Sequence, residues 1–168
     1  MSDLVFLPAY QLARMIRERE VSAVEVLNAY LAQIAKHNPK LNAICTLDED
    51  TALTRAKLAD EALARGTNWG ALHGVPVTIK DIFETAGLLT TAGYIPLKDY
   101  VPKQDATVVA RLRAAGAVIL GKTNMAELAG MRSRAGIIQR PSPLDPDVRL
   151  SSHLAPDSIR QCLLLMCT

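Results

Sequence analysis

Hydrophobic residues recur at helical spacing in three stretches of the first 65 residues. In the clearest stretch Glu25 follows Ser22 by three positions, the pattern of a capping box at a helix start. Apolar residues then repeat with the period of an amphipathic helix, at Val24, Leu27, Leu31 and Ile34. The sequence predicts that this helix stops at residues 37–39, His-Asn-Pro. Further helices are predicted over residues 9–19 and 51–65.

Short β-branched and apolar runs replace the helical pattern after residue 74. The run 74–81, Gly-Val-Pro-Val-Thr-Ile-Lys-Asp, predicts a strand with alternating faces: Val75, Val77 and Ile79 on one, Thr78 and Lys80 on the other. A helix is expected from residue 105, and the run 117–120, Ala-Val-Ile-Leu, predicts a second buried strand. A strand, a crossover helix and a strand together predict a parallel βαβ unit.

The connections around this unit also carry information. The 23 residues from 82 to 104 form a connection far longer than usual, which is typical of a functional or mobile loop. Residues 121–125 are expected to begin another helix, with Thr123 or Asn124 as its cap. The predicted fold class is α/β, with a helical lead-in and a βαβ unit in segment 1–130 and an irregular tail over 131–168.

Composition separates the same two segments. All seven lysines lie before residue 130, whereas the tail has five arginines and no lysine. The basic and acidic residues balance before residue 130, 14 against 14, so the tail carries the whole net charge of +2. A neutral body with 4% aromatic residues lacks the basic, stacking surface of a nucleic-acid-binding protein.

Several other classes are also disfavoured. No apolar run is long enough to span a membrane and the N-terminus does not resemble a signal peptide, so we expect a cytoplasmic protein without a membrane partner. The three cysteines, Cys45, Cys162 and Cys167, lack metal-site spacing and are expected to be free thiols. Neither a metal nor an organic cofactor is expected.

Lys80 is the first candidate for chemistry. It follows an apolar strand, and the carboxyl ends of strands in open α/β sheets are where ligands usually bind. Burial there would lower the lysine pKa toward the range of a general base. The alternative is a lysine that reaches into water or pairs with Asp81.

The residues around Lys80 belong to a larger set of motifs. In chain order these are Pro39–Ala43, Gly-Ala-Leu-His-Gly-Val-Pro-Val-Thr-Ile-Lys-Asp at 70–81, Thr-Thr-Ala-Gly at 90–93, Asp-Ala-Thr-Val-Val at 105–109 and Ala-Gly-Ala-Val-Ile-Leu-Gly-Lys-Thr-Asn-Met-Ala-Glu at 115–127. Together, over residues 8–130, they resemble the amidase signature family. Their order and spacing make this resemblance far more specific than any single motif.

The resemblance implies an enzyme that cleaves small-molecule carboxamides with a Ser-Ser-Lys triad, or the corresponding subunit of a tRNA-dependent amidotransferase. Lys80 maps onto the base of the triad. In the family both serines, and the amides that hold the oxyanion, come from a Gly-Gly-Ser-Ser-Gly-Gly segment and the residues after it. The chemistry requires these parts together, because a neutral serine must lose its proton to a positioned base.

This chain departs from the family pattern after residue 130. Only Gly136 follows, so there is no Gly-Gly-Ser-Ser-Gly-Gly segment, and Ser151-Ser152 lacks flanking glycines and is expected to be a surface or disordered pair. We therefore expect an inactive or truncated form that carries only the lysine. A frameshift near codon 130 would account for the altered composition, and the other reading frames of the DNA would then encode the serine segment.

A non-enzymatic alternative stays open: an interaction fragment that pairs with a partner, or with itself, through an open sheet edge. Other motif residues receive structural interpretations. His73 is expected to be a loop histidine, and Lys122 and Asp105 are expected at a strand end and a helix start. Tyr94 follows Gly93 where many family members have serine, which leaves the substrate class open.

Overall fold

The computed structural model describes residues 4–129, and the predicted features of the tail lie outside them, including the Ser151-Ser152 pair and two of the cysteines. The helices of this part are α1 (Ala9–Arg17), α2 (Ala23–Leu41), α3 (Glu49–Ala64) and α4 (Thr107–Ala114). Its strands are β1 (Ile44–Leu47), β2 (Pro76–Lys80) and β3 (Val118–Thr123). Short 3-10 turns cover Leu4–Phe6, Ile95–Leu97 and Glu127–Ala129. No helix in this part is long and apolar enough to cross a membrane.

The three strands form one mixed sheet in the order β1-β3-β2. β2 and β3 are parallel and α4 lies between them in sequence, so the predicted α/β class and βαβ unit are confirmed. β1 pairs antiparallel with β3 and was not predicted. It has only four residues, Ile-Cys-Thr-Leu, and its pairing partner lies far along the chain.

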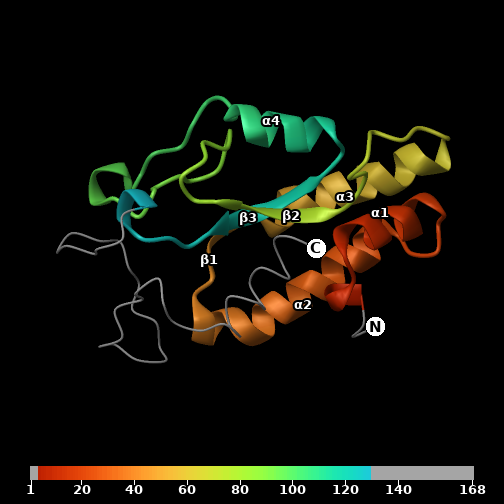
Figure 1. Cartoon of the computed structure of the whole chain (residues 1–168), viewed down its shortest axis with the longest axis horizontal. Coiled ribbons are helices and arrows are strands. Elements are labelled where there is room, and N and C mark those ends of the chain that lie inside the picture. Colours follow the sequence, from red (N-terminus) through yellow and green to blue (C-terminus); the bar gives the residue numbers. More distant parts are fainter. Residues whose placement is uncertain (1–3, 130–168) are drawn as a thin grey trace.

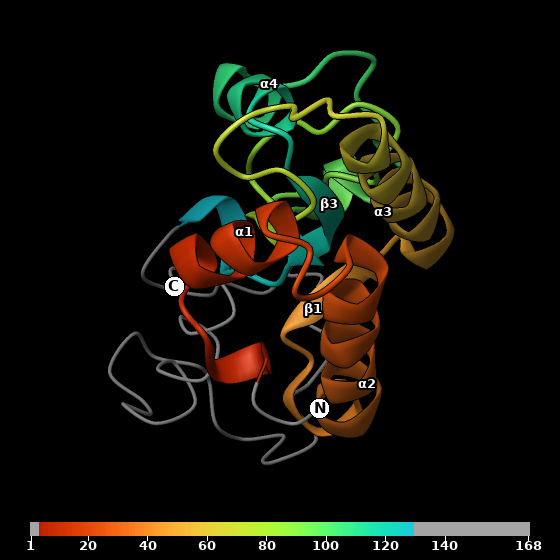
Figure 2. The same cartoon turned by 90° about the vertical axis from the view of Figure 1, so that its right-hand side faces the viewer.

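Helices cover both faces of this sheet. Figure 1 shows α4 above the sheet with α1 and α2 below it, and the turned view keeps β3 between α4 and α2 (Figure 2). The larger apolar cluster joins α1, α2 and α3 to Val75, Val118 and Leu120. The smaller cluster lies under α4 and contains Ile79, Leu88, Val109 and Ile119, with Val77 packed against it.

The predicted face of the first strand is therefore partly wrong. Val77 and Ile79 pack on the α4 side, whereas Val75 packs on the side of α1 to α3. The strand begins only at Pro76, so the alternation of faces does not extend back to Val75.

The capping box of α2 is confirmed, but its predicted end is wrong. The Ser22 side chain accepts a hydrogen bond from the Glu25 backbone N–H, and the Glu25 side chain accepts one from Ser22 N–H. The helix continues through Pro39 to Leu41, and its C-cap, Asn42, has a left-handed conformation. Proline lacks only its own N–H bond, and the Asn42 N–H still reaches Asn38 O at 2.7 Å, so the last turn closes.

The helix predicted to begin at residues 121–125 is also wrong. Gly121, Lys122 and Thr123 continue β3, because β1 and β2 pair with them on either side. Gly121 has no side chain to obstruct this pairing, and a Cβ there would overlap Thr46 O in β1. Two neighbouring strands thus override the local helical signal.

Candidate active site

Lys80 lies where the carboxyl ends of two parallel strands meet. It is the last residue of β2, and its register partner is Thr123, the last residue of β3. Its Nζ donates a hydrogen bond to Asn124 O at 2.7 Å. The expected position at the strand end is confirmed, and the ammonium is tied to the adjacent strand.

The burial considered for Lys80 is not found, since its side chain is exposed. The helical layer meets the start of β2, where Gly74 lies against Ala23 and Ile16, whereas Lys80 at the end of the strand is exposed. Lys80 does not pair with Asp81 either, because that carboxylate contacts Lys122.

Lys122 is the buried lysine of this region, with no exposed side-chain surface. Its Nζ donates to Phe83 O at 2.8 Å and to Thr90 Oγ1 at 2.7 Å, and lies 3.6 Å from Asp81 Oδ1. Burial lowers the pKa of Lys122, and the Asp81 carboxylate opposes that shift. Its expected place at a strand end is confirmed, although its contacts extend into the long loop.

Asp81 ties the same loop to β2 and is 2% exposed. Its Oδ2 accepts hydrogen bonds from Thr91 Oγ1 at 2.6 Å and from Thr91 N–H at 3.1 Å. The Asp81 backbone carbonyl accepts another from Ala92 N–H at 3.2 Å. The Thr-Thr-Ala-Gly motif of the sequence is thus held against the ends of the two parallel strands.

Two threonine hydroxyls share the sheet face of Lys80. Thr78 lies two residues before Lys80 on β2, and Thr123 lies opposite Lys80 on β3. Within residues 4–129, Oγ1 of both threonines is buried without a hydrogen-bond partner. Lys80 is the exposed polar group of this set, and both hydroxyl oxygens lie beneath the surface beside it.

His73 has a structural role in this arrangement. It is 1% exposed, accepts a hydrogen bond from Trp69 N–H at Nδ1 (3.0 Å) and donates from Nε2 to Ala59 O (3.1 Å). These roles require the neutral imidazole with its proton on Nε2. The ring lies in the loop before β2, as expected, and both of its nitrogens are hydrogen-bonded there.

Asp105 joins the long loop to α4. Its Oδ1 accepts from Ala86 N–H and its Oδ2 from Arg113 Nε, each at 2.7 Å. The expected position before a helix is confirmed. Tyr94 is half-buried directly after Gly93, whose left-handed conformation (φ +64°) brings the loop against the Met125 carbonyl.

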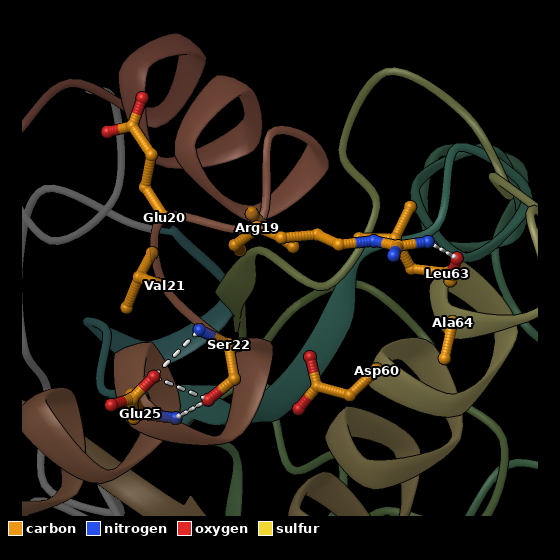
Figure 3. Close-up of a pocket in the computed structure, with 9 residues that line it drawn as sticks. Arg19, Glu20, Val21, Ser22, Glu25, Asp60, Leu63 and Ala64 are labelled. Atoms are coloured by element: carbon orange, nitrogen blue, oxygen red, sulfur yellow. Dashed lines mark hydrogen bonds between the residues drawn. The ribbon is translucent and has the colours of Figure 1, made fainter.

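A pocket of about 290 Å³ lies elsewhere, between the α1–α2 connection and α3. Figure 3 shows Arg19 extending across it to the Leu63 carbonyl, which it reaches at 2.7 Å. Asp60 accepts hydrogen bonds from the first amides of α2, Ala23 N–H at 2.7 Å and Val24 N–H at 3.2 Å. Arg19 and Asp60 thus join elements on either side of this pocket, and none of its lining residues comes from β2 or β3.

No group of His, Cys, Asp and Glu within residues 4–129 is arranged to hold a metal ion. Cys45, in β1, is a free thiol, and burial raises its pKa. Its Sγ donates to Lys122 O at 3.4 Å.

Sequence reasoning found Lys80 but missed its surroundings. The sequence predicts Asp81 only as a possible partner of Lys80 and Thr123 only as a possible helix cap, and it assigns no role at the site to the threonines at 78, 90 and 91. The threonine pair in an unusually long loop, together with a second lysine at the next strand end, was the available signal. Their contacts depend on residues 32 to 41 positions apart.

Comparisons with known proteins agree with the motifs. The family model described as Amidase matches residues 25–138. A glutamyl-tRNA(Gln) amidotransferase subunit from Acidothermus cellulolyticus is 50% identical over 129 residues, which is 77% of this chain and 26% of that protein. The Streptomyces coelicolor protein of the same name is 46% identical over the same length, with the same coverage. This chain therefore spans about a quarter of the length of these curated relatives.

Solved structures show the same relationship. Native peptide amidase from Stenotrophomonas maltophilia superposes with a TM-score of 0.69 at 36% identity, over 77% of this chain and 27% of that one. Fatty acid amide hydrolase superposes with a TM-score of 0.73 at 26% identity, over 80% of this chain and 24% of that one. The family match, the relatives and the shared fold lead to one conclusion: the chain belongs to the amidase signature family.

Proposed function

We propose that this chain supplies the lysine-bearing part of an amide-hydrolysing site, with Lys80 as the base of a Ser-Ser-Lys triad. The observation that carries the proposal is the position of Lys80 at the joined carboxyl ends of β2 and β3, where its exposed ammonium is oriented by Asn124 O at 2.7 Å.

The chemistry follows from the amine. A neutral Lys80 Nζ accepts the proton of a bridging serine, which accepts the proton of the attacking serine as that oxygen bonds to the amide carbon. Backbone amides hold the developing oxyanion, at about 3 kcal/mol per donor. The proton held by Lys80 returns through the bridging serine to the leaving nitrogen as the C–N bond breaks, which releases ammonia or an amine. Water then attacks the acyl-serine, giving its proton to the same base, and releases the carboxylate and the free serine.

The relatives favour one version of this function. The curated glutamyl-tRNA(Gln) amidotransferase subunits reach 50% identity, whereas the solved amidases compared above are 26% and 36% identical. We therefore propose a role like that of these amidotransferase subunits, with a small carboxamide as substrate and partner subunits in the complete assembly. A stand-alone amidase is the other form of the same chemistry. The proposal places the protein in the cytoplasm, which cell fractionation would test.

A chimera tests the role of Lys80. Residues 1–129 of this chain would replace the matching segment of the Acidothermus cellulolyticus relative, and ammonia release from glutamine would be measured. We expect Lys80→Met to lower the rate by at least about 100-fold, since a general base typically contributes 10²–10⁴. Lys103→Met, at an exposed loop position, is the matched control and should leave the rate unchanged. An active Lys80→Met chimera would refute the assignment.

The interaction-fragment alternative rests on a different observation. β1 and β2 form the two edges of the described sheet, and exposed edges favour pairing with another strand. On this alternative the full chain self-associates, whereas a sharply melting monomer in size-exclusion chromatography with light scattering would argue against it.

A further inference from the structure

We propose that the buried Asp81–Lys122 pair is a positioning device for Lys80, and that its main contribution is the geometry of that side chain and not the stability of the fold. The inference rests on the proposed function, because it concerns the residue assigned there as the base. Both members are almost completely buried, and each lies beside one end of the Lys80 hydrogen bond.

The pair holds the ends of the two parallel strands to a single loop. On the β3 side, Lys122 donates to Phe83 O and to Thr90 Oγ1. On the β2 side, the Asp81 carboxylate accepts two hydrogen bonds from Thr91. The first half of the 82–104 loop is thereby fixed to the ends of β3 and β2 by one buried cation and one buried anion.

The constraint passes directly to Lys80. Asp81 follows Lys80 in the chain, and its N–H donates to Thr123 O at 3.1 Å. Asn124, which provides the carbonyl that accepts from Lys80, comes two residues after Lys122. The Asn124 N–H is in turn bound to Ala43 O at 2.8 Å. Donor and acceptor of the Lys80 hydrogen bond therefore lie on segments held in place by the pair.

Stability alone does not account for such a pair. Removing two charges from water costs several kcal/mol per ion, and apolar replacements of buried ion pairs are often neutral or stabilising. The Lys122 Nζ to Asp81 Oδ1 distance of 3.6 Å is also longer than a good charged hydrogen bond, and Asp81 Oδ1 has no hydrogen-bond partner in the described part of the chain. The closer contacts of both groups go to the loop.

NMR of the full 168-residue chain, labelled with ¹³C-lysine, tests this directly. The two Hε protons of an ordered lysine have separate chemical shifts, whereas those of a freely rotating lysine coincide. We expect separate Hε shifts for Lys80, and coincident shifts for the exposed lysines at 36, 40, 57, 98 and 103. Assignment would use Lys80→Arg, and urea unfolding would measure stability in parallel.

Three sets of substitutions in the Asp81–Lys122 pair and its loop contacts should make the two Hε shifts of Lys80 coincide. Asp81→Asn removes the anion. Thr90→Val removes one acceptor of Lys122 and leaves the Asp81–Lys122 pair intact. If Asp81→Asn fails to fold, the Hε shifts of Thr90→Val test the proposal. The double variant Asp81→Asn/Lys122→Met removes both charges together, so it should be more stable than Asp81→Asn alone, which leaves Lys122 as an unpaired buried charge, while the two Hε shifts of Lys80 still coincide.

The Asp105–Arg113 pair provides the matched control. It also ties the 82–104 loop, but to α4, with Nε and Oδ2 2.7 Å apart. Asp105→Asn should leave the Lys80 shifts unchanged. Any of three results would overturn the proposal. The two Lys80 Hε shifts could coincide in the parent chain, they could stay separate in Thr90→Val, or they could coincide equally in Asp105→Asn. None of these results depends on the activity of the chimera, so the two proposals fail separately.

Discussion

At the scale of single residues, two lysines of similar sequence context have opposite surroundings. Lys80 and Lys122 both stand at the ends of parallel strands, yet Lys80 is exposed and Lys122 is fully buried. The difference arises because the two side chains project from opposite faces of the sheet. Lys122 points to the side covered by the long loop, whereas Lys80 shares its face of the sheet with Thr78 and Thr123.

His73 provides a prediction at this scale. His73→Leu leaves the Trp69 N–H and the Ala59 carbonyl without their partners in a buried place. We expect the free energy of unfolding to fall by about 1–3 kcal/mol, measured by urea denaturation. His37→Leu, at an exposed position of α2, should change it by less than about 0.5 kcal/mol. Equal effects would show that His73 is not held by these bonds.

Tyr30 predicts a pH dependence. It is 7% exposed, and burial raises the pKa of its phenol above the ordinary value of 10.0. As pH rises past 10.0, the unfolded chain ionises first while the folded chain keeps a neutral phenol, so unfolding becomes easier. The stability difference between the parent and Tyr30→Phe should therefore be constant below that pH and shift in favour of Tyr30→Phe above it. Urea titrations at a series of pH values measure this difference, and a constant value throughout would contradict the prediction.

At the scale of secondary-structure elements, β3 organises the described part of the chain. It is the central strand, and all six of its residues are buried. Its parallel neighbour β2 presents Lys80, and its antiparallel neighbour β1 closes the opposite side. Extension of β3 through Gly121 and Lys122 is what brings the second lysine to the loop.

Gly121 tests this account of β3. A Cβ at this position would overlap the backbone carbonyl of Thr46, so Gly121→Ala must displace β1. We expect a loss of about 3 kcal/mol or more by urea unfolding, together with loss of hydrogen-exchange protection in β1. Gly87→Ala is the comparison, because its φ of +79° adds backbone strain but its Cβ meets no atom within 4 Å. Its expected cost is about 1 kcal/mol, and a larger cost than that of Gly121→Ala would contradict the close-approach argument.

At the scale of the whole molecule, the described residues form two apolar clusters on opposite faces of a three-stranded sheet. This part of the chain has the fold of the amidase signature family, and the chain spans about a quarter of the length of its curated relatives. The proposed triad would require serines in a glycine-rich segment, which this sequence does not contain.

Activity-based labelling provides the prediction at this scale. The purified 168-residue chain should not react with a serine-directed fluorophosphonate, because no serine in it has the required glycine-rich context. The Acidothermus cellulolyticus relative, tested in parallel, is the positive control for the probe. Labelling of this chain that disappears in Lys80→Ala would show that it does hold a working nucleophile.

Much of this protein could be predicted from local sequence patterns. The Ser22–Glu25 capping box, the three early helices and the βαβ unit depend on residues close together in the chain, and the motif order located Lys80 and the family. Tertiary structure decided the rest. It continued α2 through Pro39, turned the expected helix at residue 121 into strand, added β1, and buried Lys122 against Asp81. Each of these outcomes depends on hydrogen-bond partners or packing surfaces that only the folded chain brings together, so local propensity could not determine them.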